Sequence, residues 1–180
     1  TDDRHWAGGR GPRSARFARV GTGGSTAVRE ALSPSDGLIS ATGSPCCMPA
    51  MEGLKMDDGS LKPGVFAFRT VDDTRGMVEY AQHDHHTRAV VIGGGLLGLE
   101  AARGLQAYGL QVEVVHAGAH LMNAQVGAQA GEILRQSVEK LGIVVNLKAR
   151  TTAILGEAKV TGIGLLDHPP IECDMVVVAA

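Results

Sequence analysis

Apolar and polar residues alternate most regularly in the second half of the chain, where they predict strands that alternate with helices. Residues 89–92 form a continuous apolar run, the pattern of a strand buried on both faces of a parallel sheet. Three glycines follow, and apolar side chains then recur at helical spacing as far as Gly109, a residue type common just after a helix. The expected buried face of this helix is Leu96, Leu99, Ala102 and Leu105. The segment therefore predicts a strand, a glycine-rich turn and a helix.

The same alternation continues toward the C-terminus. Residues 111–115 predict a second strand and residues 143–147 a third. Between them, residues 125–141 predict a helix that Gly142 closes. The expected buried face of that helix is Ala130, Leu134, Val138 and Leu141. Short strands joined by turns are expected at 151–155, 160–165 and 175–179. This order predicts an α/β fold, a Rossmann-like parallel sheet flanked by helices with a short β-meander.

The region before residue 86 carries weaker patterns. Residues 1–35 are rich in Gly and Arg and show no apolar period, so we expect little order there. A short apolar strand is expected to end at Gly43, and another is expected at residues 65–68. Thr70 or Asp72 can then cap a helix, because each side chain offers an oxygen acceptor to free backbone amides.

Composition narrows the function classes. The chain has 180 residues, 44% of them hydrophobic and 20% charged, which suits one folded domain or a piece of a larger protein. Its net charge of −2 gives no basic footprint for nucleic acid, and no apolar run approaches the about 20 residues that span a bilayer. The N-terminal arginines could suggest a phosphate-binding arm, but a low-complexity segment is the preferred interpretation. Three cysteines and no signal-peptide pattern favour a reducing compartment, so the cytoplasm is expected.

The glycine-rich turn carries the most specific chemistry. Residues Gly93, Gly94, Gly95, Leu96, Leu97 and Gly98 satisfy the G-x-G-x-x-G pattern between a buried strand and a helix. In that pattern Gly93 permits the tight turn, Gly95 lets the backbone approach a diphosphate, and Gly98 allows close packing of helix on strand. Amides at the helix start would then hold the diphosphate. The motif predicts a dinucleotide site, and the alternative is a glycine-rich turn without a ligand.

A second test of a dinucleotide site lies at the end of the following strand. An acid usually accepts the ribose hydroxyls of NAD there, about 20 residues after the loop, and this chain has His116. An imidazole can bond a ribose hydroxyl or, when protonated, a 2′-phosphate, so NADH and NADPH both remain open. His120 is close enough in sequence to contribute. The alternative is that His116 is an exposed residue at a strand end.

Other reactive side chains favour structural interpretations. Cys46 and Cys47 are adjacent, whereas redox dithiols are separated by several residues, so a catalytic disulfide is not expected. Cys173 precedes an apolar strand and is expected to be a packing residue. The residues His83, Asp84, His85 and His86 have the chemistry of metal ligands, but a solvated linker is preferred because ligands from a second region are lacking. We therefore expect no metal site and no catalytic side chain.

Three segments together resemble a known family. Residues 38–44, 64–73 and 91–101 are similar to the pyridine nucleotide-disulfide oxidoreductase superfamily. Within it, residues 93–102 and 121–126 most resemble the large subunit of assimilatory NAD(P)H-dependent nitrite reductases, including the histidine at the strand end. The resemblance covers residues 36–180.

The resemblance implies a flavoprotein in which NAD(P)H reduces FAD by hydride transfer. It implies that Thr42 and Gly43 lie beside the flavin, that Glu100 lies near the nicotinamide, and that the motif glycines bind the diphosphate. In the full-length family, sirohaem and a 4Fe-4S cluster then reduce nitrite to ammonia. Those two groups are not expected in this chain.

Departures from the family pattern predict a fragment. The N-terminal FAD fingerprint is not recognisable in residues 1–32, and the chain stops where relatives return to the FAD domain. The predicted organisation is an atypical segment at 1–35, an incomplete piece of a FAD-binding domain at 36–85, and an NAD(P)H-binding domain at 86–180. Expected partners are NAD(P)H and the remainder of the flavoprotein or its electron-acceptor domain. A rubredoxin or ferredoxin reductase and a non-catalytic nucleotide-binding fragment remain alternatives, and the oligomeric state is open.

Overall fold

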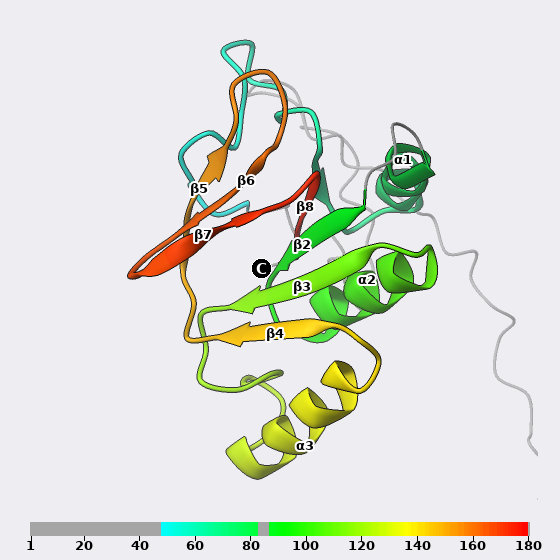
Figure 1. Cartoon of the computed structure of the whole chain (residues 1–180), viewed down its shortest axis with the longest axis vertical. Coiled ribbons are helices and arrows are strands. Elements are labelled where there is room, and N and C mark those ends of the chain that lie inside the picture. The colour runs from blue at the N-terminus through cyan, green and yellow to red at the C-terminus, as the bar shows by residue number, and fades with distance from the viewer. Residues whose placement is uncertain (1–47, 83–86, 180) are drawn as a thin grey trace, which may run out of the picture. The chain divides into compact units, whose positions relative to one another are not determined.

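Five parallel strands form the central sheet of the computed structural model, which describes residues 48–82 and 87–179 (Figure 1). Their order across the sheet is β1, β8, β2, β3, β4, and every neighbouring pair is parallel. Their bounds are Val65–Ala67 for β1, Arg88–Ile92 for β2, Gln111–His116 for β3, Val144–Leu147 for β4 and Met175–Val178 for β8. Val90, Val91 and Val177 are almost completely buried because both faces of the sheet are covered. The predicted parallel sheet is confirmed.

Helices cover one face of this sheet. Helix α2 (Leu96–Ala107) connects β2 to β3, and helix α3 (Ala128–Glu139) connects β3 to β4 (Figure 1). One core cluster lies on this face, where the alternate strand residues Ala89, Val91, Val112 and Val114 pack with α2 side chains such as Ala102 and Leu105. The period of two along the strands therefore directs every second side chain toward the helices.

A smaller antiparallel sheet covers the opposite face. It consists of β5 (Thr151–Leu155), β6 (Gly162–Leu165) and β7 (His168–Glu172) in sequential order. The second core cluster includes Val90, Ile92 and Val176 from the main sheet together with Ile154 and Ile163 from the small one. The described residues thus form three layers, with helices, a parallel sheet and the predicted β-meander.

Helix α1 (Val71–Gln82) follows β1 and begins with a capping box. The Asp73 amide donates to Thr70 Oγ1 at 3.1 Å, and the Thr70 amide donates to Asp73 Oδ2 at 2.7 Å. Thr70 is therefore the cap. Asp72, the other candidate, forms an exposed ion pair with Arg75 at 3.0 Å.

The segment before β1 is attached to the small sheet. Glu52 forms a parallel bridge with Ala153, and the Ile154 amide donates to the Glu52 carbonyl at 2.8 Å. Lys62 is buried, and its Nζ donates to the Gly156 carbonyl at 2.6 Å. These bonds satisfy the polar groups of a segment that has little regular structure of its own.

Several predicted details are wrong. Leu96 is 64% exposed and Leu141 is 45% exposed, and Ala130 is also exposed. The other predicted face residues do pack on the core, with Ala102, Leu105 and Val138 buried and Leu99 and Leu134 partly buried. The buried faces also use small residues that were not predicted there, with Gly98 and Ala101 on α2 and Gly131 on α3. Small side chains let a helix approach a sheet closely, whereas the sequence pattern gives more weight to large apolar residues.

Element boundaries also differ from the predictions. Helix α3 begins at Ala128 rather than at residue 125, and β6 begins at Gly162 rather than at residue 160. Strand β7 was not predicted because it contains Pro169 and Pro170, which the sheet tolerates on an edge strand. Within the described ranges, every helix is too short or too polar to cross a membrane.

Candidate functional site

The glycine loop connects β2 to α2 at the carboxyl end of the parallel sheet. Gly93 has a φ of 118°, a conformation that favours glycine, and its amide donates to the Val115 carbonyl at 2.9 Å. Gly95 is the N-cap residue of α2, and no side chain caps this helix end. The turn therefore leaves backbone amides at the helix start without the usual capping partner.

The glycines of the loop are required for different reasons. A Cβ atom at Gly98 would collide with the carbonyl oxygen of Gly93, so this position must be glycine for α2 to pack against β2. A Cβ atom at Gly95 would meet no atom within 4 Å, so this glycine faces open space. The space above Gly95 fits a group that approaches the backbone, as the diphosphate of a dinucleotide does.

His116 lies directly against the glycine loop. The Gly94 amide donates to His116 Nδ1 at 3.2 Å. A Cβ atom at Gly94 would lie 2.8 Å from His116 Cγ, so a side chain there would collide with the ring. Nε2 is buried and has no hydrogen-bond partner within residues 48–82 and 87–179. The residue is therefore partly buried and in contact with the loop, rather than an exposed residue at a strand end.

The segment after β3 folds over the same loop. Leu121 is fully buried, and the Met122 amide donates to the Gly94 carbonyl at 2.8 Å. The ring of His120 instead packs against Gly131 of α3, where a Cβ atom would lie 2.6 Å from His120 Nδ1. Of the two histidines considered, the structure brings His116 to the glycine loop and places His120 beside α3.

Three further predicted residues lie on the first turns of α2. Leu96 and Leu97 are 64% and 48% exposed, and Glu100 is exposed as well. Their exposure leaves all three side chains available to a bound molecule. Thr42 and Gly43, the predicted flavin contacts, lie outside the described residues.

Sequence reasoning named Gly94 only as a motif residue and missed Gly118 and Leu121 as residues that lie against His116 and the loop. Gly94 and Gly118 both lack a side chain where one would collide with the imidazole ring, and Leu121 packs against Gly94. The segment that contains Leu121 was part of the family resemblance, but contacts between residues far apart in sequence cannot be assigned from spacing alone.

Cys173 is a packing residue, as predicted. It is 4% exposed within the core cluster beneath the small sheet. Burial raises the pKa of its thiol to about 12, with a further contribution from the neighbouring Asp174 carboxylate. Cys46 and Cys47 lie outside the described residues, as do His83, Asp84, His85 and His86. Among the residues that the structure describes, no group of three His, Cys, Asp or Glu side chains could hold a metal ion.

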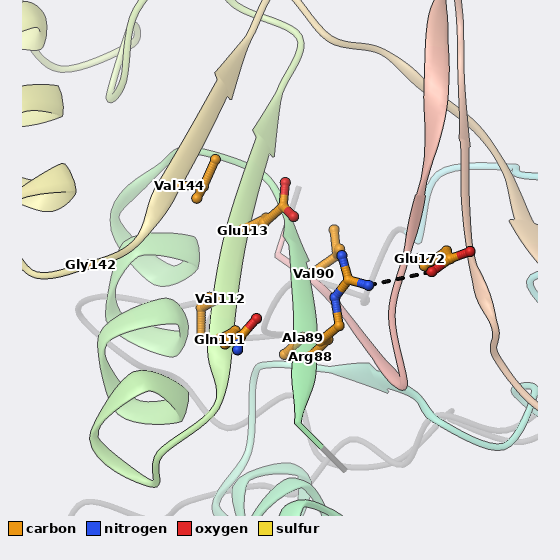
Figure 2. Close-up of a pocket in the computed structure, with 9 residues that line it drawn as sticks. All are labelled: Arg88, Ala89, Val90, Gln111, Val112, Glu113, Gly142, Val144 and Glu172. Carbon is orange, nitrogen blue, oxygen red and sulfur yellow. Dashed lines mark hydrogen bonds and ion pairs between the residues drawn. The ribbon is translucent and has the colours of Figure 1, made fainter.

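A pocket lies at the other end of the parallel strands (Figure 2). Its lining includes Arg88 and Gln111, the first residues of β2 and β3, whereas the glycine loop follows the last residue of β2. Arg88 forms an ion pair with Glu172 at 3.4 Å, and Asn146 donates to Glu113 at 3.0 Å. Its charged groups are thus already paired, and the pocket is separate from the loop.

Comparisons with known proteins identify similar chains. The chain is 42% identical over 164 residues to the NAD(P)H nitrite reductase of Bacillus subtilis, covering 89% of this chain and 19% of that protein. It is 39% identical over 146 residues to the electron transfer subunit of the assimilatory nitrate reductase of the same organism, covering 81% of this chain and 18% of that protein. The chain therefore spans about a fifth of the length of these curated relatives.

Solved structures show the same fold. The ferredoxin reductase for the CYP199A2 system from Rhodopseudomonas palustris matches with a TM-score of 0.62 and 32% identity, over 66% of this chain and 29% of that one. A FAD-dependent pyridine nucleotide-disulphide oxidoreductase from Desulfovibrio vulgaris matches with a TM-score of 0.64 and 26% identity, over 74% of this chain and 32% of that one.

The family match covers most of the sequence. Residues 16–180 match the pyridine nucleotide-disulphide oxidoreductase family. This match begins nearer the N-terminus than the resemblance at residues 36–180 and includes part of the Gly- and Arg-rich segment. The glycine loop, the parallel sheet and this match agree, and the chain belongs to the pyridine nucleotide-disulphide oxidoreductase family.

Proposed function

We propose that this chain is the NAD(P)H-binding module of a FAD-dependent oxidoreductase. The single observation that carries the proposal is the open space above Gly95, at an uncapped helix start beyond the carboxyl end of β2. Ligands of open α/β sheets bind at this edge. The positive end of the α2 dipole favours an anion there, and free amides can donate to its oxygens.

The proposed dinucleotide extends from the loop in two directions. Its adenosine ribose lies near the end of β3, beside His116, whose own Nε2 is buried and therefore out of reach of the ligand. Its nicotinamide lies toward Glu100, as the family resemblance implies, with the exposed Leu96 and Leu97 as apolar contacts. The motif glycines hold the diphosphate between these two ends.

In this proposal the protein contributes orientation rather than acid–base chemistry. When bound, NAD(P)H supplies a hydride to FAD. The loop amides fix the diphosphate, and the exposed leucines exclude water beside the nicotinamide. Thr42 and Gly43 remain the proposed flavin contacts on this chain.

The proposed full-length enzyme is of the nitrite reductase large-subunit type. Two relatives named for nitrite reduction and nitrate assimilation, at 42% and 39% identity, support this assignment. Sirohaem and 4Fe-4S chemistry would belong to the rest of such an enzyme, together with the electron-acceptor domain. The similarity to a ferredoxin reductase at 32% identity supports a second candidate, a reductase that passes electrons to a separate ferredoxin.

Titration of the purified chain with NADH, NADPH and adenosine tests the proposal. Nucleotide fluorescence or calorimetry gives the affinities, and the visible spectrum gives the flavin content. We expect NADH or NADPH to bind and adenosine, which lacks the diphosphate, to bind much more weakly. If neither dinucleotide binds to the folded chain, the proposal is wrong.

A further inference from the structure

The imidazole ring of His116 is enclosed between two glycines. On one side, a Cβ atom at Gly94 would lie 2.8 Å from His116 Cγ. On the other side, a Cβ atom at Gly118 would lie 2.5 Å from His116 Nε2 and 3.0 Å from Asn123 Nδ2. The ring therefore occupies a slot that exists because neither neighbour has a side chain.

Both polar groups of Gly94 have partners in the surrounding segments. Its amide donates to His116 Nδ1 at 3.2 Å, and its carbonyl accepts from the Met122 amide at 2.8 Å. These two bonds fix the orientation of the peptide groups on either side of Gly94. The next residue, Gly95, begins the helix and faces the open space.

The contact with Gly94 also determines where the ring proton lies. Nδ1 accepts a hydrogen bond from a backbone amide, so in the neutral ring Nδ1 carries no proton and Nε2 does. The backbone of His116 is held separately, since its carbonyl accepts from the Ala149 amide at 3.1 Å.

We propose that His116 is a positioning residue, which holds the glycine loop in its diphosphate-binding conformation by accepting the Gly94 amide at Nδ1. This role rests on the proposed function, because it concerns the same loop. It differs from a contact with the ribose, since it acts through Nδ1 and the loop backbone rather than through Nε2. The positioning role requires a hydrogen-bond acceptor at the place of Nδ1, and it does not require an imidazole ring.

Two substitutions separate these roles. In His116→Asn, the side-chain oxygen can take the place of Nδ1 as acceptor, whereas the donor at Nε2 is lost. In His116→Gln, the amide reaches the place of Nε2, and no acceptor remains at the position of Nδ1. His168→Asn, on the exposed edge strand β7, is the matched control for a histidine-to-asparagine change.

The test measures binding of ADP, which carries a diphosphate, by the full chain and by each variant. We expect His116→Asn and His168→Asn to bind ADP within about twofold of the unchanged chain, and His116→Gln to bind about five- to tenfold more weakly, the effect of one lost hydrogen bond. Thermal unfolding of each variant shows whether it is folded. Equal weakening of ADP binding in the folded Asn and Gln variants would overturn the positioning role.

Nitrogen NMR of the ligand-free chain provides a spectroscopic readout. The signals of His116 are assigned by their absence from His116→Asn, and we expect the tautomer with the proton on Nε2. A neutral ring protonated on Nδ1 would overturn the inference without bearing on nucleotide binding. Failure of the unchanged chain to bind ADP, NADH and NADPH would instead overturn the proposed function, and the positioning role with it.

Discussion

At the level of single residues, the glycines of one loop differ in what prevents a side chain at each position. Gly98 is constrained by the Gly93 carbonyl, and Gly94 is constrained by His116 and Leu121. Gly95 has no such neighbour. Glycine is therefore required for folding at the first two positions. At Gly95 no protein atom requires glycine, so the absence of a side chain there fits contact with a ligand.

Replacing Gly98 by alanine is expected to destabilise the fold. The new Cβ would collide with the backbone of Gly93, and α2 would have to shift from β2. Overpacking of this kind costs about 1–3 kcal/mol of unfolding free energy. Gly104→Ala on the same helix is the control, since no atom lies within 4 Å of its added Cβ. It is expected to stabilise the chain by about 0.5–1 kcal/mol. Urea unfolding checks both values, and an unchanged stability of Gly98→Ala would contradict the packing described.

Cys173 predicts a dependence of stability on alkaline pH. Burial raises the pKa of the thiol from its ordinary 9.0 to about 12 in the folded chain. Above pH 9 the unfolded chain therefore loses this proton while the folded chain keeps it, so stability falls as the pH rises from 9 to 12.

Cys173→Ala should remove that contribution. We expect the stability difference between the unchanged chain and Cys173→Ala to shrink as the pH rises above 9. Because the comparison is a difference, the titration of tyrosines and lysines cancels. Denaturant unfolding at a series of pH values measures it, and a difference that stays constant to high pH would show that the thiol ionises freely.

At the level of elements, helix α1 depends on a cap that the sequence revealed only in part. Thr70 and Asp73 exchange bonds with each other's amides, whereas Asp72 pairs with Arg75 on the exposed surface. Thr70→Ala is expected to cost about 1 kcal/mol of stability. Asp72→Ala, the control, removes only an exposed pair worth about 0.2–0.5 kcal/mol. Unfolding curves compare the two, and an equal loss in both would mean that the capping box stabilises the chain no more than the exposed ion pair does.

The elements that were predicted correctly share a strong local signal. The apolar run of β2 predicts a buried strand, and positive φ values at Gly109 and Gly142 follow the predicted helix ends. The strand at 175–179 was predicted only as one of the short C-terminal strands, whereas β8 lies between β1 and β2 in the parallel sheet. Strand β7 was missed because consecutive prolines obscure an edge strand. The helix faces were predicted in large part, since Leu105 and Val138 are buried, but contact through Gly98 and Gly131 depends on the partner surface, which the sequence does not display.

The candidate site also has features that could be predicted from the sequence and features that could not. The spacing of the motif glycines is local, so the loop and its place between β2 and α2 could be predicted. The contact of His116 with the Gly94 amide could not, because it depends on the register between β2 and β3 and on the direction of the side chain. The prediction for His116 was a ribose contact or an exposed residue at the strand end, and neither included the bond to the Gly94 amide.

At the level of the whole molecule, the described residues form one three-layer unit with the glycine loop at the carboxyl edge of its sheet. Binding at this edge should protect backbone amides locally. On addition of NADH or NADPH, we expect slower hydrogen exchange in residues 93–100 and 116–123, and unchanged exchange in β7 and in the pocket around Arg88. Protection centred on that pocket instead would place the nucleotide at the opposite edge.

Gly95→Val tests the central claim most directly. The valine side chain would enter the open space without meeting another atom at its Cβ, and the backbone at Gly95, with φ of −84°, suits any residue. The variant should therefore fold like the unchanged chain, as thermal unfolding would show. We predict that its affinity for NADH and NADPH falls at least about a hundredfold, because the side chain occupies the place of the diphosphate. A folded Gly95→Val chain that binds either dinucleotide as tightly as the unchanged chain would contradict the account.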